Sequence, residues 1–561
     1  MRAPTGPRAL RRRRGVLAPL VAALLVVLAG CVSIPTSGPV TEGAVAVDEG
    51  GRIDVLAEGP QEGAQPEEIV QGFLLAGAAG FGDDFVVARQ FLTGDARAEW
   101  SPLAGVVVAG SVDLQRTSTS EVSVSVPVVA RVDADGRYAE AAAGAAQQVT
   151  YGLVQGASGE WRIASLPDGL VLPRSVFATQ FRSAPLWFLS PDRTSLVPEV
   201  RWFPERNLAT AVVQALLAGP SPWLRDAVAT AVPDGARLVG SVPVDAAGVA
   251  QVTLAPPAAV LEADRGLLLA QLEATLALPR VSRAQVSSGD VVLEDPVALE
   301  SGVVTSGAPE MLQDGSLVRL AGGGLEPVDE VGSLAGLGAR SPARSEDGSV
   351  RVLLTDAGLV RAPSPGGEPV VLVPGADLAA PGVDRLGWAW TARTGDGGGL
   401  WAAGPDGAVV EVTADWLDDR RVRSLRVSRD ATRVAVVSEG VDGVAVDVAG
   451  VVRDEGGVPR TAGEAVRVGA SLVDATSVAW VDATTLAVVG RSTGAPALHL
   501  VPVAGATVVQ PELSDLAAVA AGRGGRNLLA ATTEGSLYRL DGPSWVRVAG
   551  VEDVRDPSYP G

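Results

Sequence analysis

Ten residues, SEDGSVRVLL at 345–354, set the architecture of the largest part of this chain. Related segments recur at 428–437 and 481–489, and each has a serine or valine, a polar turn and then an apolar strand. The intervals are close to one or two multiples of about 40–50 residues, which is the period of propeller blades. We therefore expect residues 305–550 to form an all-β propeller of about five to seven blades.

The strand before the polar turn is predicted at Leu386-Gly387-Trp388 and at Val478-Ala479-Trp480. A single four-stranded blade cannot bury both of its faces, whereas a closed ring of blades buries them and leaves no open edge. A pair of open β-sandwiches is the alternative that this pattern leaves.

Upstream of the propeller, residues 185–300 mix helical and extended patterns. A helix is predicted over 207–218, where Gly219 ends it and Pro220 prevents its resumption. Strands are predicted over 196–202, 237–242 and 249–254, and a further helix over 265–278. The Gly-Pro pair after the helix and the ATAVPDG segment at 229–235 resemble the GerMN module, which implies an α+β fold without established catalytic residues.

A third folded unit is predicted over 66–172. Pro66, followed by two glutamates, marks a helix start, and further helices are predicted over 84–92 and 96–100. The period then changes to two, since valines alternate with serines over 122–126. Strands are expected there and over 128–132, 148–154 and 161–166. Helices followed by an antiparallel sheet are an α+β layout, and the order resembles the NTF2-like fold.

The segment DADG at 133–136 has two interpretations. It has the first acids of a calcium loop, but it lacks an oxygen ligand before the glycine and a glutamate at position twelve. Because Asp-Gly is common in hairpin turns, we expect a turn.

The N-terminus has the order of an export signal. Six arginines precede or flank a short apolar run over 16–27, which Leu28-Ala29-Gly30-Cys31 follows. This tetrapeptide resembles the bacterial lipobox, which implies cleavage after residue 30 and conversion of Cys31 to an N-palmitoyl, S-diacylglycerol cysteine. An uncleaved transmembrane helix is the alternative, but the apolar run is shorter than the roughly 20 residues that a span needs. Residues 1–30 are thus the predicted signal peptide, and 31–65 a lipidated tether.

Composition excludes several chemistries. The chain of 561 residues has a net charge of −20, which disfavours nucleic acid as a partner. All 45 basic residues are arginine, so the sequence has no lysine for a P-loop or for forming a Schiff base. With Cys31 acylated and only one histidine, ordinary zinc and copper sites are not expected either. We predict no cofactor and no resident metal.

Catalytic patterns are weak. His499 alternates with leucines, and no Gly-x-Ser-x-Gly motif accompanies it, so it is interpreted as a blade-strand residue. Glycoside hydrolysis by a pair of carboxylates remains an alternative, because Asp and Glu are abundant in the sequence. Five tryptophans lie in or beside apolar strands, where core packing is favoured over a sugar platform: Trp388, Trp390, Trp401, Trp480 and Trp545. We predict that the protein is not an enzyme.

The order of lipobox, CVSIPTSGP at 31–39, NTF2-like unit, GerMN module and propeller resembles the actinobacterial LpqB lipoprotein family. The resemblance implies an extracytoplasmic protein, anchored in the cell membrane by its lipid, that contacts the ectodomain of the sensor histidine kinase MtrB. It would thereby influence phosphorylation of MtrA and the control of cell envelope and division. Of the family's residues, only Cys31 carries over.

Two other hypotheses remain open at this stage. In the first, the protein is a cell-wall carbohydrate-binding or carbohydrate-active propeller protein that contacts peptidoglycan. In the second, it is a scaffold for wall assembly without a signalling role. Two carboxylates roughly 5–10 Å apart in an open cleft would favour the carbohydrate-active alternative.

Overall fold

The computed structural model describes residues 57–301, 305, 307–395, 399–522 and 524–561. The predicted signal peptide, Cys31 and the tether up to residue 56 lie outside the described residues. Residues 57–65, which the sequence analysis assigns to the tether, lie against the first folded domain, where Ala57 and Ala64 join its hydrophobic core.

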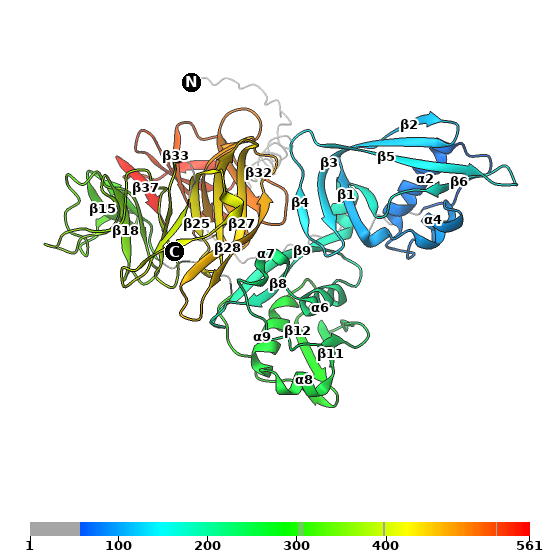
Figure 1. The fold of residues 1–561 in the computed structure, drawn as a ribbon, viewed down its shortest axis with the longest axis horizontal. Helices are drawn as coiled ribbons and strands as arrows, with labels where there is room; N and C mark the ends of the chain where they lie inside the picture. Colours follow the sequence, from blue (N-terminus) through cyan, green and yellow to red (C-terminus); the bar gives the residue numbers. More distant parts are fainter. Residues whose placement is uncertain (1–56, 302–304, 306, 396–398, 523) are drawn as a thin grey trace, which may run out of the picture. The chain divides into compact units, whose positions relative to one another are not determined.

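The N-terminal domain begins with helix α2 (Pro66–Ala79), as predicted. Pro66 occupies the first turn, and the backbone N–H of Gln65 donates a 2.7 Å hydrogen bond to the Glu68 carboxylate. This capping arrangement satisfies a backbone donor that the helix leaves free. Ile69, Val70 and Phe73 are buried in the core of this domain. Helix α2 lies against the sheet (Figure 1). Short helices α3 (Val86–Gln90) and α4 (Gly94–Glu99) occupy the other two predicted positions.

The sheet of this domain has the order β6-β5-β3-β1-β7, with β2 and β4 also paired to β3. The two valine-rich strands predicted over 122–132 are one continuous strand, β3, in which Val122, Val124 and Val126 are fully buried. The remaining elements are β1 (Gly105–Ala109), β2 (Asp113–Ser118), β3 (Glu121–Asp133), β4 (Tyr138–Glu140), β5 (Ala146–Gln155), β6 (Trp161–Ser165), β7 (Leu170–Pro173), α5 (Arg174–Gln180) and the 3-10 turn η1 (Pro102–Ala104).

The DADG segment is a turn between β3 and β4, as predicted. The Asp133 carboxylate accepts hydrogen bonds from the backbone N–H groups of Asp135 and Arg137. Gly136 has φ of 81°, and a Cβ there would lie 2.6 Å from the Trp202 carbonyl oxygen. Glycine is therefore required because the turn packs on a strand of the next domain.

The central domain starts with a long hairpin of β8 (Phe181–Leu189) and β9 (Leu196–Pro204). A second sheet has the order β10-β11-β12-β13, in which β11 and β12 are parallel. Helices α6 and α9 contact β8, and they share one buried core with it. The elements are α6 (Leu208–Ala218), α7 (Pro222–Arg225), β10 (Arg237–Leu238), β11 (Val249–Ala255), α8 (Pro257–Glu262), α9 (Arg265–Thr275), β12 (Arg283–Ser288) and β13 (Val291–Val292).

Both predicted helices of this domain are present, as α6 and α9, and Gly219 ends α6 with φ of 92°. The predicted strand over 237–242 was too long. Its ladder contains only Arg237 and Leu238, because Gly240 takes φ of 72° and turns the chain out of the extended conformation. The predicted last helix likewise ends at Thr275 rather than at residue 278.

The C-terminal domain contains six four-stranded sheets in the described part of the chain. We number them as blades 1 to 6. Blade 1 has β37 (Val554–Ser558), β14 (Glu310–Gln313), β15 (Ser316–Ala321) and β16 (Gly324–Pro327); blade 2 has β17 (Arg340–Arg344), β18 (Arg351–Thr355), β19 (Gly358–Arg361) and β20 (Val370–Pro374); blade 3 has β21 (Gly382–Val383), β22 (Ala389–Ala392), β23 (Leu400–Ala403) and β24 (Val409–Val412).

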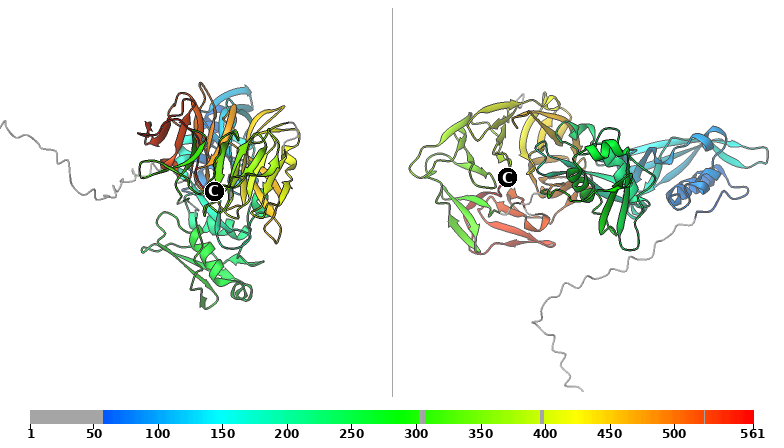
Figure 2. Two further views of the ribbon diagram at one scale, coloured as in Figure 1. Left: turned by 90° about the vertical axis from the view of Figure 1, so that its left-hand side faces the viewer. Right: turned by 90° about the horizontal axis from the view of Figure 1, so that it is seen from below.

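Blade 4 has β25 (Arg421–Val427), β26 (Arg433–Gly440), β27 (Gly443–Arg453) and β28 (Pro459–Val468); blade 5 has β29 (Asp474–Trp480), β30 (Thr485–Arg491), β31 (Ala497–Pro502) and β32 (Val508–Val509); blade 6 has β33 (Leu516–Ala520), β34 (Leu529–Thr532), β35 (Leu537–Asp541) and β36 (Ser544–Arg547). The first strand of each blade contacts the first strand of the next, from β37 through β17, β21, β25, β29 and β33 back to β37. The sheets therefore form a closed, propeller-like ring (Figure 2).

The recurring segments form the same turn in three blades. In blade 2 the Ser345 hydroxyl donates to Asp347 over 2.6 Å and accepts from the Val350 N–H, so the turn after the first strand is tied at both ends. Ser428 and Asp430 repeat this pattern in blade 4, and Asp482 accepts from the Thr484 N–H in blade 5. The repeat thus encodes the turn between the first and second strands of a blade.

One strand prediction in the ring was wrong. Leu386-Gly387-Trp388 is not the strand before the turn, because it lies in the turn itself, between β21 and β22. Asp384 holds this turn by accepting from the N–H groups of Leu386 and Trp388, and Gly387 takes φ of 80°. Val478-Ala479-Trp480 does lie in the first strand of its blade, β29, as predicted.

Candidate functional site

The predicted lipidation residue, Cys31, lies outside the described residues. Among the residues that the structure describes, no helix combines the length and the apolar character needed to cross a bilayer. Acylation of Cys31 is therefore still a prediction.

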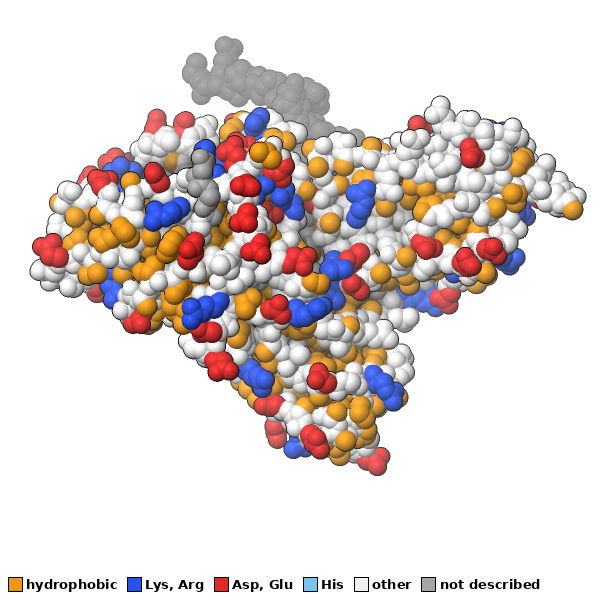
Figure 3. Space-filling model, in the orientation of Figure 1, with side chains coloured by type: hydrophobic (Ala, Val, Ile, Leu, Met, Phe, Trp, Pro, Cys, Tyr) orange, Lys and Arg blue, Asp and Glu red, His pale blue; other side chains and the backbone are white. Residues whose placement is uncertain are grey.

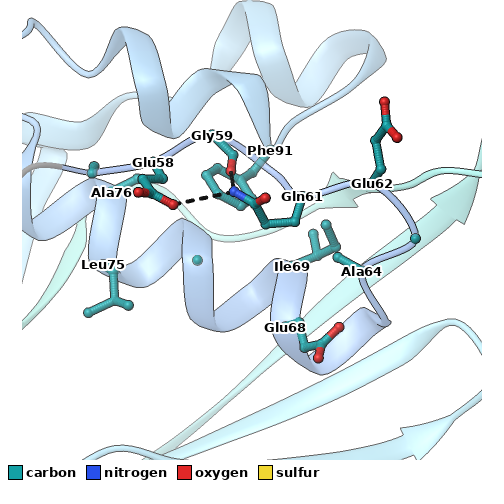
Figure 4. A pocket seen from close by; sticks show the side chains of 13 residues that line it. Glu58, Gly59, Gln61, Glu62, Ala64, Glu68, Ile69, Leu75, Ala76 and Phe91 are labelled. Atoms are coloured by element: carbon teal, nitrogen blue, oxygen red, sulfur yellow. Dashed lines mark hydrogen bonds between the residues drawn. The ribbon is translucent and has the colours of Figure 1, made fainter.

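A groove of about 590 Å³ lies where the described chain begins, between residues 57–64 and helix α2 (Figure 4). Its apolar part is formed by Ile69, Leu75 and Phe91, and Leu75 is 56% exposed. The Gln61 side-chain amide donates to the Gly59 carbonyl over 3.3 Å and to Glu58 over 3.4 Å (Figure 4). These contacts shape the loop that forms one wall.

Small residues in the groove allow its walls to approach closely. A Cβ on Gly72 would lie 2.5 Å from the Phe91 ring, so this helix position accommodates only glycine without rearrangement. Three carboxylates, those of Glu58, Glu62 and Glu68, line the groove with no histidine, cysteine or serine beside them.

A second cavity, of about 420 Å³, lies beside blade 6. Three acids and two aromatic residues line it, together with polar residues of the neighbouring turns. The principal lining residues are Glu512, Asp515, Glu534, Tyr538 and Trp545. The indole N–H of Trp545 donates to the Pro511 carbonyl over 2.8 Å, which orients its ring. Small-molecule sites generally combine aromatic side chains with a few polar groups, and the lining of this cavity has both.

His499 lies in β31 and is 1% exposed. Its Nδ1 lies 3.1 Å from the Ala497 carbonyl and its Nε2 lies 3.2 Å from the Ser492 hydroxyl. Burial lowers the pKa of His499, although the hydrogen bond with Ala497 acts in the opposite direction. The ring nitrogens thus face a carbonyl and a hydroxyl inside a blade, which supports the structural interpretation of this histidine. Ser492 belongs to no sequence motif, so its contact with His499 could not be predicted from the sequence.

The tryptophans behave mainly as core residues. Trp388, Trp390 and Trp480 are at most 8% exposed, and the Trp390 indole N–H donates to Asp384 over 2.9 Å. Trp401 and Trp545 are partly exposed. Within the described residues, no group of three or more His, Cys, Asp or Glu side chains is arranged to hold a metal ion.

The charged side chains visible in Figure 3 include both signs, and the basic ones on that face do not form a continuous stripe. The geometry as a whole defines a protein of several folded domains, two α+β and one propeller-like. Three family models match these domains: "Lipoprotein LpqB, N-terminal domain" at 59–178, "Sporulation and spore germination" (Germane) at 185–292 and "Lipoprotein LpqB beta-propeller domain" at 315–560.

Full-length relatives agree with these matches. Lipoprotein LpqB of Streptomyces coelicolor is 30% identical over 98% of this chain and 98% of its own length. Lipoprotein LpqB of Thermobifida fusca is 29% identical over 96% of this chain and 98% of its own length. Lipoprotein LpqB of Cutibacterium acnes is 29% identical over 86% of each chain. This chain belongs to the LpqB lipoprotein family.

Proposed function

We propose that this protein is a membrane-anchored extracytoplasmic accessory that modulates a sensor histidine kinase of the MtrB type without catalysing a reaction itself. Membership of the lipoprotein family carries the proposal. It is supported by the lipobox at Leu28-Ala29-Gly30-Cys31, by an acidic chain with no lysine and by cavities suited to binding. The protein shifts the kinase only insofar as it binds one kinase conformer more tightly than another.

Anchoring is tested at Cys31. Metabolic labelling with palmitate and membrane fractionation of wild type and Cys31→Ser are compared in the native host. We expect wild type to be labelled and retained in the membrane, because two or three acyl chains anchor stably, and Cys31→Ser to remain unlabelled and unprocessed. A labelled and fully processed Cys31→Ser protein would refute the assignment of this residue.

Kinase modulation is tested with the mature chain carrying Cys31→Ser and the purified kinase ectodomain. Binding at micromolar concentration and a change in the phosphorylation rate of the full-length kinase in liposomes are expected. Residues 57–65 must be retained, because they line the groove beside α2 and contribute to the domain core. Absence of binding, with both proteins shown to be folded, would contradict the proposal.

A second candidate function, binding of wall carbohydrate, is favoured by the cavity beside blade 6. Sedimentation with purified peptidoglycan is compared for wild type and for Trp545→Ala, with Trp401→Ala in blade 3 as the control. Carbohydrate binding predicts that only Trp545→Ala loses the interaction, since Trp545 lines the cavity. Equal sedimentation of all three proteins would dismiss the cavity as the binding site.

A further inference from the structure

The hairpin of β8 and β9 contacts more than its own domain. At one end, Trp202 packs on Phe177 of the N-terminal domain with ring centroids 4.9 Å apart. Its indole N–H donates to the Ala504 carbonyl in blade 5 over 2.8 Å. In the middle, the Pro198 carbonyl lies 3.5 Å from Nη1 of the buried Arg433 in blade 4. The hairpin therefore connects the central domain to the ring along its length.

The tip of this hairpin has the same turn as the blades. The Ser190 hydroxyl donates to Asp192 over 2.6 Å and accepts from the Ser195 N–H over 3.1 Å, as Ser345 and Ser428 do in their blades. Asp192 then reaches the ring, where Nη2 of Arg385 lies 2.8 Å from both of its carboxylate oxygens. Arg385 is itself held by the Asp430 carbonyl, which accepts from its Nε over 3.2 Å.

Asp192 remains ionised in this setting. Burial raises its pKa, but hydrogen bonds from Ser190, Arg385 and Thr194 outweigh this effect and lower the pKa to about 2. The side chains of Arg385 and Asp192 are 21% and 41% exposed, so the pair is accessible to salt but not fully solvated.

A second contact of different chemistry accompanies the ion pair. Helix α7 packs on β27 and β28 of blade 4. A Cβ on Gly450 of β27 would lie 2.8 Å from the Ala227 Cβ and 2.8 Å from the Trp223 carbonyl oxygen. Gly450 has no positive φ, so its lack of a side chain serves this close approach and not the backbone conformation. Apolar residues of the two domains continue into one buried cluster.

We propose that the central domain and the propeller domain are held together as one body by the Asp192–Arg385 interdomain ion pair and by the contact of α7 on Gly450. A binding partner would then meet one fixed composite surface instead of two domains on a flexible linker. Reversing the charge of one partner of the ion pair is expected to loosen this joint. This joint is independent of whether the partner is the proposed kinase.

The joint is tested by electron-electron distance measurements on the mature chain. The sequence has a single cysteine, so in a Cys31→Ser background the substitutions Glu262→Cys and Glu368→Cys give two unique labelling sites. Glu262 ends α8 of the central domain, Glu368 lies in the propeller domain, and both are exposed. We expect one narrow distance distribution. A broad distribution in this parent protein would overturn the proposal.

Charge reversal then isolates the ion pair. Arg385→Asp places two carboxylates against each other, and we expect the narrow distribution to be lost. The double variant Asp192→Arg with Arg385→Asp restores opposite charges and should restore the narrow distribution. Arg547→Asp is the matched control, because Arg547 pairs with Glu552 over 3.1 Å beside blade 6, whereas the contacts of the joint are made by blades 3 and 4. A narrow distribution in Arg385→Asp, or failure of the double variant to restore it, would overturn the role of the pair.

The contact of α7 on Gly450 is tested by a substitution that leaves the charge unchanged. Gly450→Val is expected to broaden the distribution, because its Cβ meets backbone of the other domain. Gly463→Val is the control, since a Cβ at Gly463 has its nearest neighbour, the Gly450 carbonyl oxygen, at 3.7 Å. Far-ultraviolet circular dichroism verifies that each variant keeps its strands. An unchanged distribution in folded Gly450→Val would refute the contact.

Discussion

Glu199 and Arg201 form a buried ion pair inside the central domain, with side-chain exposures of 3% and 5%. Nε and Nη2 of Arg201 each lie 3.0 Å from one carboxylate oxygen of Glu199. The same carboxylate accepts from the Ser221 N–H, and Arg201 donates to the Gly219 carbonyl, both over 3.0 Å. The pair thus holds the Gly-Pro-Ser-Pro turn that starts α7. These charges are satisfied structurally, so they are not free for catalysis.

Replacing Glu199 by Gln should destabilise the protein by about 3–5 kcal/mol, because it leaves the Arg201 charge buried without a counter-ion. Urea unfolding followed by fluorescence measures the loss. The control is Glu326→Gln, which breaks the exposed Arg319–Glu326 pair at 3.5 Å and should cost about 0–1 kcal/mol. Similar effects of the two substitutions would show that the buried pair contributes no more than a surface pair.

His499 gives a pH prediction that can be assigned to one side chain, because the sequence has a single histidine. Burial lowers its pKa in the folded protein, so the unfolded chain binds the proton more readily. Stability is therefore fully present above the unfolded pKa of about 6.5 and falls as the pH decreases below it. Thermal unfolding between pH 5.5 and 7.5 should show this slope in wild type and a flatter profile in His499→Gln. An equal slope in both proteins would assign the effect to other groups.

At the scale of elements, strand β37 closes the ring. It comes from the C-terminal side of the sequence but pairs with β14, the first strand of the domain in sequence order. Val554 of β37 is fully buried in the core of blades 1 and 6, while its neighbour Arg555 is exposed. A ring closed by strands from both ends of the domain is held together at that blade, and radial repetition leaves only short, protected strand edges.

Val554→Asp should lower the free energy of unfolding by roughly 3–5 kcal/mol, because it buries a carboxylate with no counter-ion at the closing strand. Arg555→Asp introduces the same residue on the exposed side of the strand and should change stability by about 0.5 kcal/mol or less. Urea titration and limited proteolysis of the ring measure both variants. If Arg555→Asp destabilised the ring as much as Val554→Asp, the register of β37 would be in question.

At the scale of the whole molecule, the net charge of −20 opposes any electrostatic attraction to an anionic membrane. Residues 1–30, the predicted signal peptide, contain six arginines and no acid, so the predicted mature chain is more acidic than the full sequence. In the proposed lipid-anchored protein, attachment to the membrane would then rest on the acyl chains, each of which contributes through its buried methylene groups.

The mature chain carrying Cys31→Ser should sediment no more with phosphatidylglycerol vesicles than with phosphatidylcholine vesicles, at any salt concentration. The acylated protein, as the control, should bind both. Salt-sensitive binding of the unacylated chain to the anionic vesicles would reveal a basic surface that the overall charge conceals.

The sequence by itself determined the features that depend on near neighbours. The start of α2 at Pro66, the end of α6 at Gly219 and the alternation of valines in β3 follow from helix capping and from periods of 3.6 and two. The recurring polar turns before apolar strands indicated the blades. The CVSIPTSGP segment at 31–39 and the order of the predicted units indicated the family. Leu386-Gly387-Trp388 was misassigned because an apolar tripeptide in a tight turn has the composition of a strand.

The tertiary structure alone decided which distant segments meet. The pairing of β37 with β14, the parallel pair of β1 and β7, the groove beside α2 and the contact of Asp192 with Arg385 join residues that are far apart along the chain. Local periodicity specifies which side of a strand or helix is buried, but it carries no information about the partner that buries it. That choice is made by packing and loop closure over the whole chain, so these contacts became visible only in the folded molecule.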